Sequence, residues 1–240
     1  MKQLLSLVAL VLSVLFYSCN KEVPGGKDAT PAITTITIDG DFSDWAAIDQ
    51  TKIVTAKHNN NSGWDGTVRR LSVYANSQYV FYLIEFDDQS LQFYMKGRDI
   101  LPTRINLNTD GEFKSGYNKY FLDSYDFMFE GELADGAGGF TNFDVKLYQR
   151  INNAWTKPEL GSGVLNAVGK DNKVEISLDI AKFNELAAKS SVPKLMGDTF
   201  QTGMTFYNGD WQPIGVLPNA PTSETDEEGL ANLLNVTIDK

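Results

Sequence analysis

The sequence predicts an all-β fold, a two-sheet antiparallel β-sandwich of jelly-roll type with one short helix. From residue 33 onward, apolar and polar residues alternate with a period of two, as in strands that have one face in a core and one in water. Gly, Asn and Asp residues typical of turns separate most of these runs. The domain would span residues 33–240, a length at which a β-sandwich still forms a single domain.

The first residues predict an export signal that ends at a cysteine. Lys2 precedes an apolar run over residues 4–16, and small Ser18 precedes Cys19. This order is typical of a secretory signal peptide. The segment resembles the lipobox of Bacteroidetes lipoproteins, in which cleavage occurs before a lipid-modified cysteine, and a plain signal peptide with an incidental cysteine is the alternative. We expect removal of residues 1–18, lipidation of Cys19, and anchoring in the cell envelope at the outer membrane, on its periplasmic face or at the cell surface.

Residues 19–32 predict a flexible linker between the lipid and the domain. They contain two prolines and two adjacent glycines and almost no apolar residues. Cys19 is the only cysteine of the chain, so we expect no disulfide and no thiol nucleophile in the folded domain.

The alternating runs predict the individual strands. Residues 69–75 and 79–86 flank Asn76 and Ser77 and predict a hairpin. The second of these runs is apolar on both faces, which indicates a central strand covered on both sides. Further strands are expected at residues 33–38, 52–56, 91–95, 103–107, 125–129, 143–149, 173–179, 199–207 and 233–238. Asp179 is a suitable N-cap for the one expected helix, whose apolar residues have helical spacing: Ile180, Phe183, Leu186 and Ala187.

A short motif opens the domain. Ile38, Asp39 and Gly40 are followed by Asp44 and Trp45. This opening, with the strands at residues 71–86 and the Glu-bearing strand at residues 174–178, resembles the DOMON-like sandwiches that include family nine carbohydrate-binding modules. The resemblance implies a sandwich fold and a carbohydrate ligand. We interpret Trp45 as a packing residue that closes one end of the core, since tryptophans of this kind usually pack.

Charge and composition exclude several function classes. The formal net charge is −10 and no long basic cluster exists, so nucleic acid is not an expected partner. His58 is the only histidine, which excludes a zinc site with two or three imidazoles and makes haem ligation improbable. We find no phosphate-binding loop and no Gly-x-Ser-x-Gly motif, and we expect no enzymatic activity; because carboxylates are abundant, a glycosidase carboxylate pair is the alternative.

Three loop tryptophans predict the ligand site. Sugar rings pack on aromatic faces, while amides and carboxylates bond their hydroxyl groups. Trp211, Trp64 and Trp155 each lie among polar residues that keep an aromatic ring near water. Packing of each ring from a loop against the core is the alternative. The expected ligand-binding residues are Trp211, Tyr207, Asn208, Asp210, Gln212, Trp64, Asp65 and Trp155.

A weaker pattern concerns calcium. Asn106, Asn108 and Asp110 place oxygen-bearing side chains at alternate positions before Gly111. The position of the bidentate glutamate of an EF-hand loop is occupied by Tyr117, which excludes an EF-hand. A hairpin turn explains Asp110 and Gly111 equally well. The resemblance to family nine modules, which bind calcium, keeps a structural Ca²⁺ open as the only expected cofactor.

The sequence therefore favours a cell-envelope lipoprotein that binds a carbohydrate without altering it. The membrane would be contacted through the lipid anchor only. The alternative is a structural or adhesive accessory lipoprotein that contacts another envelope protein and has no small ligand. Retention on a glycan, lost when the loop tryptophans are replaced, would separate the two.

Overall fold

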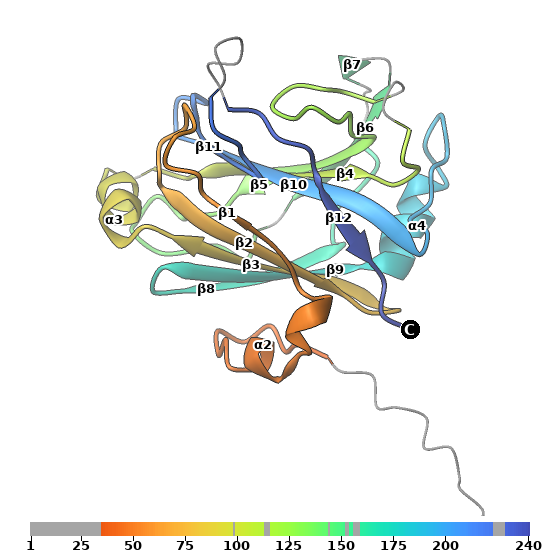
Figure 1. Ribbon diagram of the computed structural model, residues 1–240, viewed down its shortest axis with the longest axis horizontal. Helices are drawn as coiled ribbons and strands as arrows, with labels where there is room; N and C mark the ends of the chain where they lie inside the picture. Colours follow the sequence, from red (N-terminus) through yellow and green to blue (C-terminus); the bar gives the residue numbers. More distant parts are fainter. Residues whose placement is uncertain are drawn as a thin grey trace, which may run out of the picture. The chain divides into compact units, whose positions relative to one another are not determined.

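The predicted two-sheet antiparallel sandwich is confirmed (Figure 1). The computed structural model describes residues 35–240 except residues 98, 113–115, 144, 152–153, 156–158 and 223–228, and the side chains of Ile151, Ala154 and Trp155. The residues of the predicted signal and linker, Cys19 included, lie outside the described residues. None of the described helices is long and apolar enough to cross a membrane.

The first sheet has five strands in the order β1-β2-β3-β9-β8. Their bounds are β1 Val54–Lys57, β2 Val68–Ala75, β3 Tyr79–Phe86, β8 Leu165–Lys170 and β9 Lys173–Asp179. β2 and β3 form the predicted hairpin, and β3 is central, between β2 and β9. Alternate β3 residues such as Tyr82 and Ile84 enter the core between the sheets, while Phe81 and Leu83 belong to a separate cluster on the outer face.

The second sheet has the order β11-β10-β4-β5-β6-β7, and β12 also pairs with β10. Its strands are β4 Pro102–Asn108, β5 Phe127–Glu132, β6 Lys146–Ile151, β7 Ala154–Trp155, β10 Thr199–Tyr207, β11 Pro213–Leu217 and β12 Leu234–Thr237. Its outer face carries a smaller apolar cluster that includes Phe121 and Tyr125. A Cβ at Gly203 would lie 2.7 Å from the Phe121 ring, so the glycine of β10 lets this ring approach the sheet closely.

The opening motif packs on the outer face of the first sheet. Trp45, in helix α2 (Asp44–Ala47), is buried with Ile36, Phe81 and Leu83. The expectation that Trp45 closes one end of the core is therefore wrong in its location, because the ring covers the outer side of β3. Glu175 of β9 fixes this segment. Its Oε1 accepts hydrogen bonds from the backbone N–H groups of Asp39 and Gly40, each at 2.7 Å.

The expected helix is confirmed, and two others were not expected. α4 (Ile180–Ala187) begins at Asp179, whose carboxylate accepts a hydrogen bond from the Lys182 N–H. The strand expected at residues 91–95 is wrong, since these residues lie in helix α3 (Asp88–Lys96). The apolar pair Leu91 and Met95 has helical i,i+4 spacing and is buried, and Asp87 caps the helix by accepting the Ser90 N–H. A 3₁₀ turn at Gln50–Lys52 precedes β1.

The strand expected at residues 33–38 is also not formed in its described part. Residues 35–38 are not paired with any described strand. This segment crosses the outer face of the first sheet instead, where Ile36 is buried.

Candidate functional site

Trp211 and Trp64, the two tryptophans favoured by the sequence, lie at opposite ends of one row of aromatic rings. The ring centroids of Trp64 and Tyr120 are 6.0 Å apart, those of Tyr120 and Tyr207 are 6.1 Å apart, and those of Tyr207 and Trp211 are 5.6 Å apart. Tyr207 is only 2% exposed, whereas Trp211 is 43% exposed. The solvent-exposed indole ring of Trp211 therefore packs on the buried ring of Tyr207.

Hydrogen bonds within the turn that carries Trp211 hold its conformation. It connects β10 to β11, and the Asn208 Oδ1 accepts hydrogen bonds from the N–H groups of Asp210 and Gln212 at 3.1 and 2.8 Å. The Trp211 N–H donates to the Asn208 carbonyl at 2.9 Å. Asn208 therefore shapes the turn, and Tyr207 supports the indole.

Trp211 has a backbone conformation that a bulky residue rarely adopts. Its φ is +59°, in the left-handed region. Such a conformation costs about 1–2 kcal/mol for an L-residue. Tyr120 in the aromatic row has φ +75°, and Phe143 has φ +51°. Strained backbone of this kind gathers at ligand-binding sites, where the surrounding structure holds it in place.

Arg104 braces the indole from β4. Its guanidinium carbon lies 4.7 Å from the centroid of the Tyr207 ring and 5.4 Å from that of Trp211. Arg104 Nε donates to Glu130 Oε2 at 2.6 Å, and its Nη1 donates to the Tyr207 hydroxyl at 2.7 Å. The cation thus contacts both rings and pairs with the carboxylate of β5.

A pocket of about 370 Å³ opens beside Trp211 on the outer face of the second sheet. Here it is called the Trp211 pocket. It is lined by Trp211, Glu130, Gly131, Glu132, Thr141, Asn142, Lys146 and Tyr148. These side chains offer carboxylates, an amide, hydroxyl groups and an ammonium next to the open indole. The arrangement can stack a flat apolar face and bond several hydroxyl groups at once.

Strand register brings the pocket residues together. Arg104 lies opposite Glu130, and Glu130 lies opposite Lys146, so the three form one row across β4, β5 and β6. Tyr148 lies opposite Met128 in the adjacent row. These residues were not predicted from the sequence, although their alternation along β5 and β6 was a usable signal.

The remaining predicted ligand residues have other surroundings. Asp65 accepts a hydrogen bond from the Thr67 N–H at 2.7 Å and from the Tyr94 hydroxyl at 3.2 Å, so its carboxylate is engaged within the protein. Asp210 is exposed and faces a separate pocket beside α3. Gln212 is exposed immediately before β11, and Trp155 lies in β7, its side chain outside the described part of the chain. The Trp211 pocket is therefore formed without these four side chains.

The calcium candidates are held by contacts within the protein. Asn108 Oδ1 accepts the Gly111 N–H at 2.8 Å, and Asn106 Nδ2 donates to the Gly203 carbonyl at 3.5 Å. Lys194 Nζ lies 2.6 Å from Asp110 and 2.5 Å from Asp126. Burial raises the pKa of Asp126, and the ammonium of Lys194 opposes that rise. Lys194 therefore supplies a positive charge between these two carboxylates. No group of three or more acidic, His or Cys side chains suited to a metal occurs among the described residues.

No protein-family model matches the chain, and a search of curated proteins finds no relative.

Proposed function

We propose that this protein is a lipid-anchored envelope protein that binds a carbohydrate at the Trp211 pocket without altering it. The observation that carries the proposal is the exposed indole of Trp211 at the edge of a pocket lined by polar side chains. The backbone of Trp211 has a strained, positive φ, and its ring is held by contacts with Arg104 and Tyr207. The resemblance of the opening motif to DOMON-like and family nine modules agrees with it.

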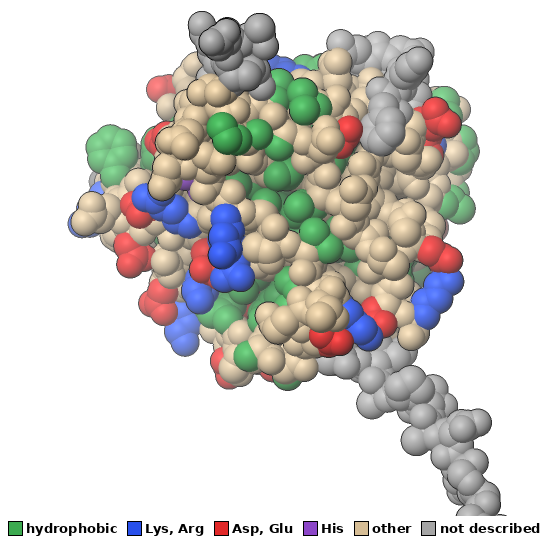
Figure 2. All heavy atoms as spheres, in the orientation of Figure 1, with side chains coloured by type: hydrophobic (Ala, Val, Ile, Leu, Met, Phe, Trp, Pro, Cys, Tyr) green, Lys and Arg blue, Asp and Glu red, His purple; other side chains and the backbone are tan. Residues whose placement is uncertain are grey.

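The chemistry of the pocket fits a saccharide better than an apolar ligand. The axial C–H groups of a pyranose pack on an aromatic face, and its hydroxyl groups need acceptors and donors around the ring. Glu130 and Glu132 supply acceptors, Lys146 supplies a donor, and Asn142 supplies both. The positive charges near the pocket are paired, Arg104 with Glu130 and Lys146 with Glu159, which favours an uncharged sugar over an anionic one. On the face seen in Figure 2, acidic and basic side chains are likewise interspersed.

The test is retention of the purified domain on a panel of soluble polysaccharides in affinity gel electrophoresis. We expect at least one polysaccharide to retard the wild-type domain, and Trp211→Ala to weaken the retardation. Stacking of a single ring typically contributes about 1–3 kcal/mol, so the affinity should fall about 5- to 150-fold. The matched control is Phe93→Ala, which removes another exposed aromatic side chain, from α3 outside the Trp211 pocket.

Two results would contradict the proposal. Retardation of Trp211→Ala equal to that of the wild type would show that the indole does not contact the ligand. Failure of every polysaccharide to retard the wild-type domain would favour the alternative, an accessory lipoprotein that contacts another envelope protein. Release of reducing ends from a retained polysaccharide would identify an enzyme, in which Glu130 and Glu132 would be the first residues to replace.

A further inference from the structure

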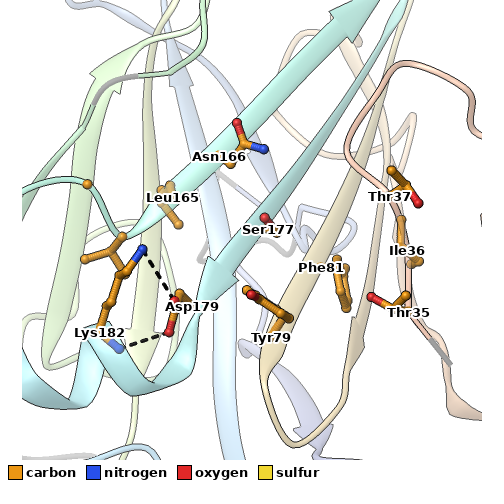
Figure 3. Close-up of a pocket in the computed structure, with 12 residues that line it drawn as sticks. Thr35, Ile36, Thr37, Tyr79, Phe81, Leu165, Asn166, Ser177, Asp179 and Lys182 are labelled. Atoms are coloured by element: carbon orange, nitrogen blue, oxygen red, sulfur yellow. Dashed lines mark hydrogen bonds and ion pairs between the residues drawn. The ribbon is translucent and has the colours of Figure 1, made fainter. Parts of the chain in front are cut away.

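A second pocket lies on the opposite sheet, on the outer face of β3, β9 and β8 (Figure 3). Here it is called the sheet-face pocket, and its volume of about 420 Å³ lies within the usual range for ligand pockets, about 300–1,000 Å³. It shares no residue with the Trp211 pocket. The N-terminal segment forms one wall through residues 35–37, and Leu165 and Lys182 lie on the other side in Figure 3.

Strand register builds the floor of this pocket. Phe81 of β3 lies opposite Ser177 of β9, and Ser177 lies opposite Asn166 of β8. In the adjacent row, Tyr79 lies opposite Asp179. One side of the floor is therefore aromatic, with Tyr79 and Phe81 ring centroids 5.8 Å apart, and the other side is polar.

The polar groups of the floor have unused hydrogen-bonding capacity. Ser177 is 9% exposed, its hydroxyl group is reached by solvent, and this group makes no hydrogen bond to another described residue. The exposed Asn166 amide is likewise without a partner in the described part of the chain. Ser177 lies at the centre of the floor in Figure 3, so a bound molecule can satisfy its hydroxyl group.

The charge of the pocket selects the class of ligand. Asp179 and Lys182 are the only charged residues among those that line it, and they pair with each other at 3.6 Å. The other polar groups are hydroxyl and amide groups from Thr35, Thr37, Tyr79, Asn166 and Ser177. A charged ligand would gain little here, whereas a molecule with an apolar face and several hydroxyl groups matches both sides of the floor.

We propose that the sheet-face pocket is a second saccharide-binding site, which takes a neutral mono- or disaccharide with its apolar face on Tyr79 and its hydroxyl groups on Asn166 and Ser177. The ligand class rests on the proposed function, but the location does not. A chain with two sites on opposite sheets would hold a polysaccharide at two points, which raises the overall affinity above that of either site.

The test is a titration of the ¹⁵N-labelled domain with methyl β-glucoside, methyl β-galactoside and N-acetylglucosamine, followed by amide chemical shifts. We expect at least one sugar to shift the backbone amide signals of Asn166 and Ser177 in a saturable way. Loss of one hydrogen bond contributes about 1 kcal/mol, so Asn166→Ala should weaken this binding about fivefold, and Tyr79→Leu should weaken it further. Asn166 is exposed and its side chain makes no hydrogen bond to another described residue, so we expect its replacement to leave the fold intact.

The matched control is Asn235→Ala, which removes another exposed strand asparagine, from β12 of the other sheet. Unchanged affinity in Asn166→Ala, or no saturable shift at residues 166 and 177 with any of the three sugars, would overturn the inference. Repeating the titration with Trp211→Ala separates the two proposals. Shifts at residues 166 and 177 that persist in this variant, when gel retardation depends on Trp211, establish two sites. If these shifts persist but no polysaccharide binds at Trp211, the sheet-face pocket is supported and the Trp211 pocket is not.

Discussion

Glu175→Ala tests how the opening motif is attached to the sandwich. Glu175 is fully buried and accepts the N–H groups of Asp39 and Gly40, each at 2.7 Å. Hydrogen bonds to a charged group contribute about 1.5–3 kcal/mol each, and removal of the buried carboxylate returns part of this as relieved desolvation. We expect a net loss of about 2–4 kcal/mol in the free energy of unfolding, which lowers Tm by about 4–16 °C for a domain of this size.

The assay is thermal denaturation followed by circular dichroism, together with tryptophan fluorescence. Because Trp45 packs in the same segment, partial release of the motif should shift the emission to longer wavelength before the sheets unfold. Glu175→Gln keeps one oxygen for both N–H groups and should lose only about 1 kcal/mol. A Glu175→Ala variant that melts within about 1 °C of the wild type would refute the view that this carboxylate anchors the motif.

Three further predictions concern stability. Burial raises the pKa of Glu175, so ionising this group costs the folded state more than the unfolded state, and the part of the stability linked to this pKa difference is lost as pH rises from the ordinary pKa through the raised value. Urea titrations between about pH 4 and pH 8 should therefore show Glu175→Gln gaining on the wild type as pH increases, and parallel curves would contradict this. Lys194→Met leaves Asp126 buried without its cation and should cost about 3–5 kcal/mol, whereas the exposed control Lys189→Met should change stability by less than about 0.5 kcal/mol in the same titration; equal losses would contradict the assignment. Phe183→Ala removes the α4 ring that packs on Phe127 and Phe129 and should lower the free energy of unfolding by about 3–5 kcal/mol in a urea titration, and a loss below about 1 kcal/mol would contradict that packing.

The sequence predicted the strands whose local pattern was strong. Residues 199–207 match β10 in full, and residues 79–86 match the central strand β3. The error at residues 91–95 arose because a short apolar run has no unambiguous period, while the better signals were the N-cap Asp87 and the C-cap Gly97. β8 was not predicted because Asn166 and Gly169 weaken the pattern of an edge strand.

Only part of the candidate site could be predicted from the sequence. Trp211 could be chosen because polar residues surround it, and it is the exposed tryptophan among those described. Glu130 and Tyr148 could not be assigned to the same pocket, since they meet through the register of β5 and β6, and non-local register depends on the packing of both sheets. The floor of the sheet-face pocket has the same origin, in a row that crosses β3, β9 and β8.

The most direct test of the central claim is a titration of the ¹⁵N-labelled domain with a polysaccharide that retards it, followed by the indole N–H signals of its four tryptophans. We expect the signal of exposed Trp211 to shift and saturate, while that of buried Trp45 stays unchanged. A Trp211 signal that does not move at saturating polysaccharide would contradict carbohydrate binding at the Trp211 pocket.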